Sequence, residues 1–326
     1  MSKIFKFIIL VIISVVGLYF AFQGEDFVIL WEHLLDVEWF AFILAVILLL
    51  FSVVVRAKRW QYILEPLEHI PLHPLFSSTM IGYFGNNVLV FRLGELLRAY
   101  SIAIGRKLTL AQAFGTVILE RVIDAGTVVC ILALLLAWIP VQNPVIQLSI
   151  ITFIGTTLIA ITFIIIAHYW DWLAFFQTYS FFKHGVPEKL LQIIEKILDG
   201  LTMIVKSKHI LALFVYSVLL WIIYFIMIYY LLVATHLDDI GLIGAGVILA
   251  MSSIAIAIPA LPGGMGTYDA GIKFSLILFF SVSSEKALAF ALVSHASNYF
   301  PYLIIGAIYF ILSGLRIKDV DQNSIQ

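Results

Sequence analysis

Charged and amide side chains interrupt two otherwise apolar segments in the first half of the chain, residues 82–98 and 109–139. In the first segment they stand beside glycines, and in the second they occupy the middle. An arginine among amides and backbone N–H groups can bind a phosphate, and a nearby carboxylate can hold that arginine or meet a cationic group. The candidates for binding a polar ligand are therefore Asn86, Asn87, Arg92, Glu95, Arg98, Glu120, Arg121 and Asp124.

The composition places these residues in a membrane protein. The 326 residues are 63% hydrophobic and 12% charged, with a mean hydropathy of +1.08. Soluble globular proteins are about 45–50% apolar, so we expect an all-α polytopic membrane protein instead. Nothing in the sequence suggests nucleic-acid binding, a cofactor or a metal site. The single cysteine, Cys130, has no disulfide partner and is expected to be a small core residue.

The charges within residues 109–139 define one polar face of a predicted helix. Glu120, Arg121 and Asp124 fall within a sector of about 100°, since each residue turns the helix by about 100°. Each charge costs roughly 2.5–3.5 kcal/mol at the centre of a bilayer, so this helix should insert only with polar partners. Arg121 can reach Asp124 at i+3, and Arg92 is the expected cation for Glu120. The alternative interpretation is a purely structural lock.

About six apolar segments are expected to cross the bilayer, in one membrane domain over residues 1–326. They are Met1–Phe22, Trp39–Val55, Thr109–Ile139, Val145–Ala167, Ile210–Thr235 and Ala287–Ser313. The loop at residues 23–38 is acidic and contains no Lys or Arg, whereas a basic run at 56–59 follows the second segment. The positive-inside rule therefore predicts a cytoplasmic N-terminus, and Arg316 and Lys318 predict a cytoplasmic C-terminus.

Two further segments are expected to enter the bilayer and turn back. Residues 75–105 form arms of about 22 Å and 18 Å as helices, each long enough to pass the midplane but too short to span about 30 Å. Residues 241–281 are expected to form a second re-entrant hairpin of opposite orientation. This arrangement is typical of an inverted repeat, which would place a site at the midplane between the halves.

A surface helix is predicted between the fourth and fifth spans. Apolar residues recur with helical spacing over residues 187–206, and charged residues stand between them. Pro187 occupies a suitable first helical position. We expect an amphipathic helix on the cytoplasmic face of the membrane.

The turn of the second hairpin, residues 259–269, contains two prolines and three glycines, which cannot continue a helix. Without bulky side chains the turn would let a polar headgroup approach the backbone, although it could be only a kinked connection. His295 and Asn298 lie one turn apart in the last span, where they could line a cavity or hydrogen-bond a neighbouring helix. The candidates in this half are Pro262, Gly263, Gly264, Gly266, Tyr268, Asp269, His295 and Asn298.

Several of these motifs resemble one known family over nearly the whole chain. They are Asn86-Asn87-Val88-Leu89, Arg92-Leu93-Gly94-Glu95-Leu96-Leu97-Arg98-Ala99-Tyr100, Glu120-Arg121-Val122-Ile123-Asp124 and the turn from Pro259 to Asp269. The chain resembles the lysylphosphatidylglycerol synthase transmembrane (flippase-like) family, as a stand-alone member without the soluble aminoacyl-transferase domain of bifunctional members. The family usually has Pro where this chain has Val90, and Val could extend the first arm where Pro would break it.

The resemblance implies a cavity through which aminoacylated or other lipids move between leaflets. We therefore expect a lipid flippase of the cell (inner) membrane rather than an enzyme, with an anionic or aminoacylated phospholipid as its partner. A homo-oligomer is left open. One alternative is a membrane enzyme acting on a lipid-linked substrate, for which His236, Asp238 and Asp239 are the outer candidates. The other is a non-transporting scaffold for envelope assembly.

Overall fold

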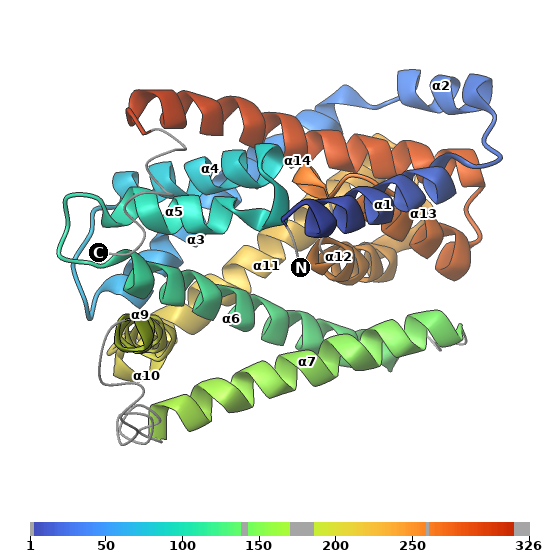
Figure 1. The fold of residues 1–326 in the computed structure, drawn as a ribbon. Helices are drawn as coiled ribbons and strands as arrows, with labels where there is room; N and C mark the ends of the chain where they lie inside the picture. Colours follow the sequence, from blue (N-terminus) through green and yellow to red (C-terminus); the bar gives the residue numbers. More distant parts are fainter. Residues whose placement is uncertain (1–2, 138–142, 170–185, 259–260, 316–326) are drawn as a thin grey trace.

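The computed structural model describes residues 3–137, 143–169, 186–258 and 261–315, and within these ranges it contains helices and no strand (Figure 1). Residues 259–260 of the second turn, and Arg316 and Lys318, lie outside the described residues. The α-helices are α1 (Lys3–Phe22), α2 (Phe27–Leu35), α3 (Trp39–Leu64), α4 (Leu72–Val88), α5 (Gly94–Ala103), α6 (Leu110–Leu136), α7 (Pro144–Tyr169), α9 (Val186–Leu201), α10 (Met203–Lys206), α11 (Ile210–Ala234), α12 (Gly241–Ala257), α13 (Thr267–Phe280) and α14 (Ser284–Leu312). Short 3₁₀ turns are η1 (Val90–Arg92), η3 (Asp238–Ile240) and η4 (Pro262–Gly264).

Within the described ranges, five helices are long and apolar enough to cross a membrane. They are α3, the segment Ile146–Ile166 of α7, α11, the segment Asp238–Ala257 that contains α12, and α14. A sixth span results if Val11–Phe22 and α2, which are bent by 88° relative to each other, count as one. The 27-residue helix α6 carries charges near its middle and starts with a capping box between Thr109 and Gln112. The predicted all-helical polytopic membrane fold is confirmed.

Helices α4 and α5 form a hairpin whose backbones nearly touch (Figure 1). A Cβ on Gly94 would lie 2.1 Å from the carbonyl oxygen of Gly82 and 2.3 Å from the backbone nitrogen of Asn86, so only glycine fits there. Val90 does not extend the first arm, because α4 already ends at Val88. How deeply this hairpin enters a bilayer remains a prediction.

The turn between these helices has an unusual backbone. Phe91 and Arg92 have φ angles of 59° and 54°, in the left-handed region that side chains other than Gly, Asn and Asp rarely adopt. Each such residue stores roughly 1–3 kcal/mol of strain, which surrounding structure must offset. The tip contact with the second hairpin, formed by α12, η4 and α13, provides such surroundings, because η4 contacts both α4 and η1.

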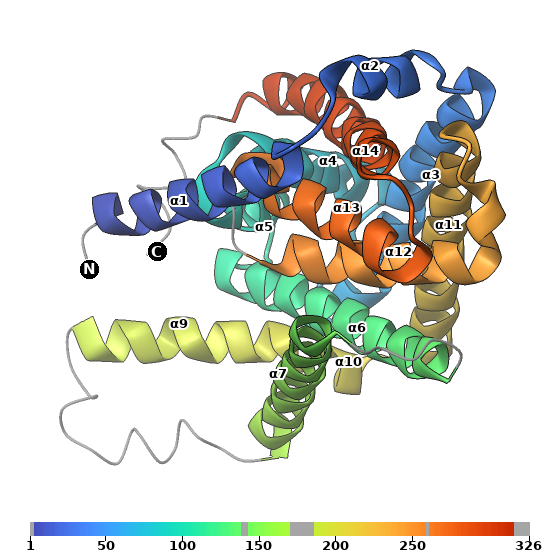
Figure 2. The ribbon, with the colours of Figure 1, turned by 90° about the vertical axis from the view of Figure 1, so that its right-hand side faces the viewer.

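The amphipathic segment forms α9 and the short helix α10, with a break at Thr202. Helix α9 is seen end-on in Figure 1 and lengthwise in Figure 2, whereas α7 is seen lengthwise in Figure 1 and nearly end-on in Figure 2. The two helices therefore run roughly perpendicular to each other. Apolar Leu190 and Ile194 of α9 are exposed, as an interfacial helix requires. Its location at the cytoplasmic surface remains a prediction.

The cores lie where the helices pair, chiefly between α3 and α11 and around the hairpins. One buried ion pair was not predicted: Lys273 of α13 contacts Glu25, which follows α1 and which we had placed in an outer loop. Cys130 was expected in the core, but its side chain is exposed on α6, which places it on the outer surface of the helix bundle. Periodicity alone cannot orient a helix that is apolar on most sides.

Candidate functional site

The second half of α3 carries two arginines into the interior. The side chains of Arg56 and Arg59 are 4% and 0% exposed. The predicted span ended at Val55, whereas α3 continues unbroken to Leu64 and buries both arginines. Their placement on the cytoplasmic side remains a prediction. Residues three apart face the same side of a helix, so both arginines point toward one neighbour.

That neighbour is α6, which supplies two carboxylates. Arg56 Nη1 lies 2.5 Å from Glu120 Oε1, and its Nη2 lies 2.9 Å from Asp124 Oδ2. Arg59 Nη1 lies 2.8 Å from Asp124 Oδ1, and its Nη2 lies 3.4 Å from Glu120 Oε1. The four side chains alternate in charge and hold α3 against α6.

Helix α5 adds one residue of each sign. Arg98 Nη2 lies 3.0 Å from Glu120 Oε2, so the fully buried Glu120 faces three arginines. Arg121 Nη2 lies 2.5 Å from Glu95 Oε1, whereas the predicted partner Asp124 lies 3.9 Å from its Nη1. We call the following residues the arginine–carboxylate cluster: Arg56, Arg59, Glu95, Arg98, Glu120, Arg121 and Asp124.

Arg92 lies outside this cluster. Its side chain is exposed on the hairpin tip, and it makes no hydrogen bond or ion pair with any described residue. It is near enough to Arg121 and Glu95 to interact electrostatically with both. The prediction that Arg92 pairs with Glu120 was wrong, because three buried arginines already surround that carboxylate.

Two aromatic residues that were not predicted as site residues, Trp60 and Tyr224, complete the surroundings of the cluster. The guanidinium of Arg98 lies 3.9 Å from the ring centre of Trp60, whose Nε1 donates to Thr116 Oγ1 at 3.0 Å. Arg56 Nη2 also donates to the hydroxyl of Tyr224 at 3.3 Å. Trp60 directly follows Arg59 in the sequence. This neighbour in a long apolar helix was the signal that could have placed Trp60 beside the buried charges.

The second tip is organised by Asp269. One of its oxygens accepts a hydrogen bond from the backbone N–H of Gly266 at 2.9 Å and so caps α13. Its other oxygen lies 2.7 Å from His295 Nδ1, which donates because an ionised carboxylate can only accept. Gly266 has a φ of 84°, which favours glycine. Asp269 therefore joins the second hairpin to α14.

Asn87, beside the first tip, is joined to α14. Its Nδ2 donates to the backbone oxygen of Tyr299 of α14 at 3.0 Å, and the Tyr299 hydroxyl donates back to the Asn87 backbone oxygen at 3.4 Å. Gly263 of η4 faces the Tyr299 ring, since a Cβ there would lie 2.7 Å from it. Asn86 instead turns toward its own hairpin, with its Nδ2 3.5 Å from Glu95 Oε1.

The remaining candidates have structural partners. Asn298 Nδ2 donates to Ser294 O at 2.7 Å within its own helix, which is neither of the two roles we considered. The hydroxyls of Tyr268 and Ser294 lie 3.0 Å apart and are buried. Pro262 and Gly264 are partly buried in η4. The structure thus gathers the candidates into two groups, the cluster and the junction of the tips.

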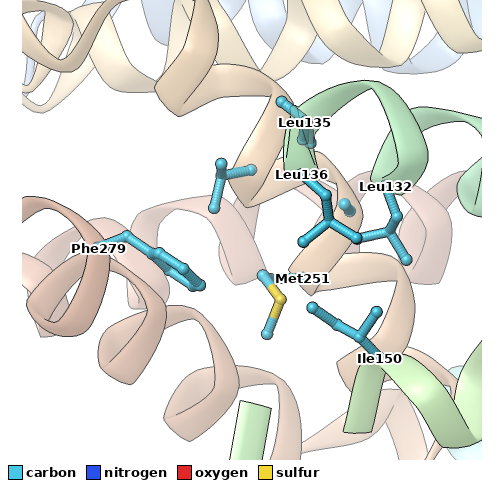
Figure 3. A pocket seen from close by; sticks show the side chains of 8 residues that line it. Leu132, Leu135, Leu136, Ile150, Met251 and Phe279 are labelled. Atoms are coloured by element: carbon cyan, nitrogen blue, oxygen red, sulfur yellow. The ribbon is translucent and has the colours of Figure 1, made fainter. Parts of the chain in front are cut away.

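A pocket seen in Figure 3 lies between α6, α7, α12 and α13, and it is apolar. It is lined by Leu132, Leu135, Leu136, Ile150, Val247, Ala250, Met251 and Phe279. None of the predicted polar candidates lines it. Among the described residues no three His, Cys, Asp or Glu side chains are placed to hold a metal ion.

These features define a class: an all-helical, multi-pass membrane protein with two contacting hairpin tips beside a buried cluster of charges. The chain belongs to the family of the lysylphosphatidylglycerol synthase TM region, whose model matches residues 7–306. It is also similar to a UPF0104 membrane protein of Methanothermobacter thermautotrophicus, with 23% identity over 291 residues that cover 83% of each chain. No solved structure matches the chain.

Proposed function

We propose that this protein moves lipid headgroups between the two leaflets of the cell membrane. The observation that carries this proposal is the contact between the hairpin tips η1 and η4, beside a cluster of charges in an otherwise apolar protein. Intramembrane charges are functional candidates by default. The acyl chains stay in the bilayer while the headgroup passes between the tips, and no covalent chemistry on the lipid is involved.

Arg92 is the first contact for the headgroup in this proposal. It is exposed and unpaired within the described residues, and the exposed apolar residues Phe91 and Leu93 flank it. A guanidinium binds phosphate oxygens through two parallel hydrogen bonds. A lipid in the bilayer can therefore place its chains against Phe91 and Leu93 and its phosphate on Arg92.

In this proposal the arginine–carboxylate cluster fixes the start of α5 directly behind the first tip. Ion pairs of 2.5–3.4 Å join α3 to α6, and ion pairs of 2.5 and 3.0 Å join α5 to α6, whereas Asn87 beside the tip is joined to Tyr299 of α14 by two hydrogen bonds. We therefore expect the tip to leave its neighbours more easily than α5 leaves α6. In this proposal both termini are cytoplasmic, which is supported by the acidic loop at residues 23–38 and its lack of Lys and Arg.

Fluorescent-lipid scrambling in proteoliposomes tests the proposal. The wild-type chain should move lipid between leaflets, and Arg92→Gln should lower the rate about tenfold, the effect of one lost charge-assisted contact. The control is Lys208→Gln, which removes another exposed cation that has no partner among the described residues. No movement by the wild type for neutral, anionic and aminoacylated lipids would contradict transport and favour a scaffold.

A further inference from the structure

The arginine–carboxylate cluster and the tips contain more arginines than carboxylates. Within the cluster there are four guanidinium groups and three carboxylates. Arg92 adds a further positive charge at the tip, and Asp269 adds a negative one on the second hairpin. Arginines therefore still outnumber carboxylates when both tips are counted. An uncompensated charge in a low-dielectric interior is unfavourable, so this region favours an arriving anion.

The buried polar atoms that lack a hydrogen bond also favour an anion, because more of them are donors than acceptors. Buried guanidinium nitrogens without a hydrogen bond are Arg56 Nε, Arg59 Nε, Arg59 Nη2, Arg98 Nε and Arg121 Nε. Of these, Arg59 Nη2 already lies 3.4 Å from Glu120 Oε1 in an ion pair. Two buried acceptors in this region also lack a hydrogen bond, Asp124 Oδ1 and Asn86 Oδ1. The first of these already lies 2.8 Å from Arg59 Nη1 in an ion pair. Free donors thus exceed free acceptors, as a site for an acceptor-rich anion requires.

The described carboxylates beside the two tips, Glu95 and Asp269, are already paired. Glu95 is the carboxylate nearest the first tip in sequence, and Arg121 lies 2.5 Å from it. Both oxygens of Asp269 accept hydrogen bonds, from Gly266 and His295. A cationic headgroup would have to displace one of these partners, and it would also be repelled by the unpaired Arg92.

We infer that the lipid handled at the tips is an anionic phospholipid, and that aminoacylated, net cationic lipids are disfavoured. This inference rests on the proposed function, because it names the substrate class of that site. Arg92 is the residue that sets the preference, since no described residue forms a hydrogen bond or an ion pair with it and Glu95 attracts it only over a longer distance.

The transport arm of the test compares three lipids with identical labelled acyl chains: phosphatidylglycerol, phosphatidylcholine and lysyl-phosphatidylglycerol. The wild type should move phosphatidylglycerol about tenfold faster than the lysylated lipid or more, because the change of headgroup charge acts across a contact of a few ångströms. Arg92→Glu should remove or reverse this preference. Lys208→Glu makes the same change in net charge at the start of α11 and should leave the preference intact. Both variants are checked for monodispersity first.

The binding arm measures the dissociation constants of short-chain versions of the same lipids for the detergent-purified full chain. Tighter binding of phosphatidylglycerol, lost in Arg92→Glu and kept in Lys208→Glu, supports the inference. Equal or tighter binding of the lysylated lipid overturns it. If no lipid is moved in proteoliposomes, the proposed function fails, and the binding arm still decides the charge preference. If the lysylated lipid is moved as fast as phosphatidylglycerol, transport stands and the inference fails.

Discussion

Glu120 is a single side chain that links three helices. It belongs to α6, and its two oxygens face Arg56 of α3 and Arg98 of α5. It is fully buried, and a buried carboxylate is stable only when it is paired. Its removal would leave guanidinium groups buried without a counter-charge. Glu120 therefore stabilises the fold, independently of the proposed function.

We therefore expect Glu120→Gln to lower the free energy of unfolding by about 3–5 kcal/mol, the usual effect of breaking a buried ion pair. Unfolding of the purified protein in mixed micelles would measure the change. Glu195→Gln is the matched control, because Glu195 is exposed on α9 and surface substitutions usually change stability by less than about 0.5 kcal/mol. Equal stability of Glu120→Gln and the control would show that the ion pairs contribute nothing.

The partners of these side chains could be predicted only in part. The spacing of Glu120, Arg121 and Asp124 correctly indicated one polar face that needs cations. It could not select Arg98 over Arg92, because sequence position gives depth along a helix and not the direction of a flexible side chain. The hairpin turn, with two residues at positive φ, leaves Arg92 exposed, and nothing in its residue types predicts that backbone.

Helices α6 and α9 cross at two glycines, at a distance that no other residue allows. A Cβ on Gly115 of α6 would lie 2.1 Å from the carbonyl oxygen of Ile197, and a Cβ on Gly200 of α9 would lie 2.1 Å from that of Gln112. Both of these oxygens are backbone atoms, so neither can move away from an added Cβ as a flexible side chain could. The crossing fixes an amphipathic helix to the start of the helix that carries the charges.

Gly115→Ala should therefore push α9 away from α6 and destabilise the protein by about 1–3 kcal/mol, as overpacking does. Hydrogen exchange of residues 186–201 should become faster. The control is Gly155→Ala on α7, where an added Cβ meets no atom within 4 Å, and where alanine favours the helix by up to about 1 kcal/mol. Unchanged exchange in Gly115→Ala would contradict the tight crossing.

The helices themselves were largely predictable, and their ends were less so. The first hairpin was expected over residues 75–105 and forms α4 and α5 over 72–88 and 94–103. The error at α3 came from applying a rule about charge at membrane surfaces to buried arginines. With 26 residues, α3 is about 39 Å long, which exceeds a bilayer core of about 30 Å, so its length was an unused signal.

In the molecule as a whole, the two hairpins touch at their tips, and other helices hold each hairpin close to its tip. Ion pairs among α3, α5 and α6 hold the first hairpin, and Asp269 and His295 tie the second hairpin to α14. The tips η1 and η4 are in contact, whereas the predicted entry of the two hairpins from opposite faces of a membrane remains a prediction. An inverted repeat remains a prediction, because the sequence similarity between the halves is faint.

In the proposed function the first tip must move away from α14 and from the second tip for a lipid to pass, and Asn87 opposes this movement. Its side chain donates to Tyr299 O of α14 at 3.0 Å, and one such hydrogen bond contributes about 1 kcal/mol. Asn87→Ala should therefore raise the population of molecules whose first tip has left α14 about fivefold. Lipid scrambling should accelerate by a similar factor, and hydrogen exchange of residues 88–93 should accelerate with it.

Adding Tyr299→Phe to Asn87→Ala should have a smaller further effect, because the hydroxyl donates to Asn87 O over 3.4 Å, near the limit of a hydrogen bond. Gln192→Ala is the control, since it removes an exposed amide of α9 remote in sequence from both tips. Faster exchange without faster scrambling would separate tip opening from transport. Slower scrambling in a folded Asn87→Ala variant would show that Asn87 binds the headgroup, and that its contact with Tyr299 does not limit the rate.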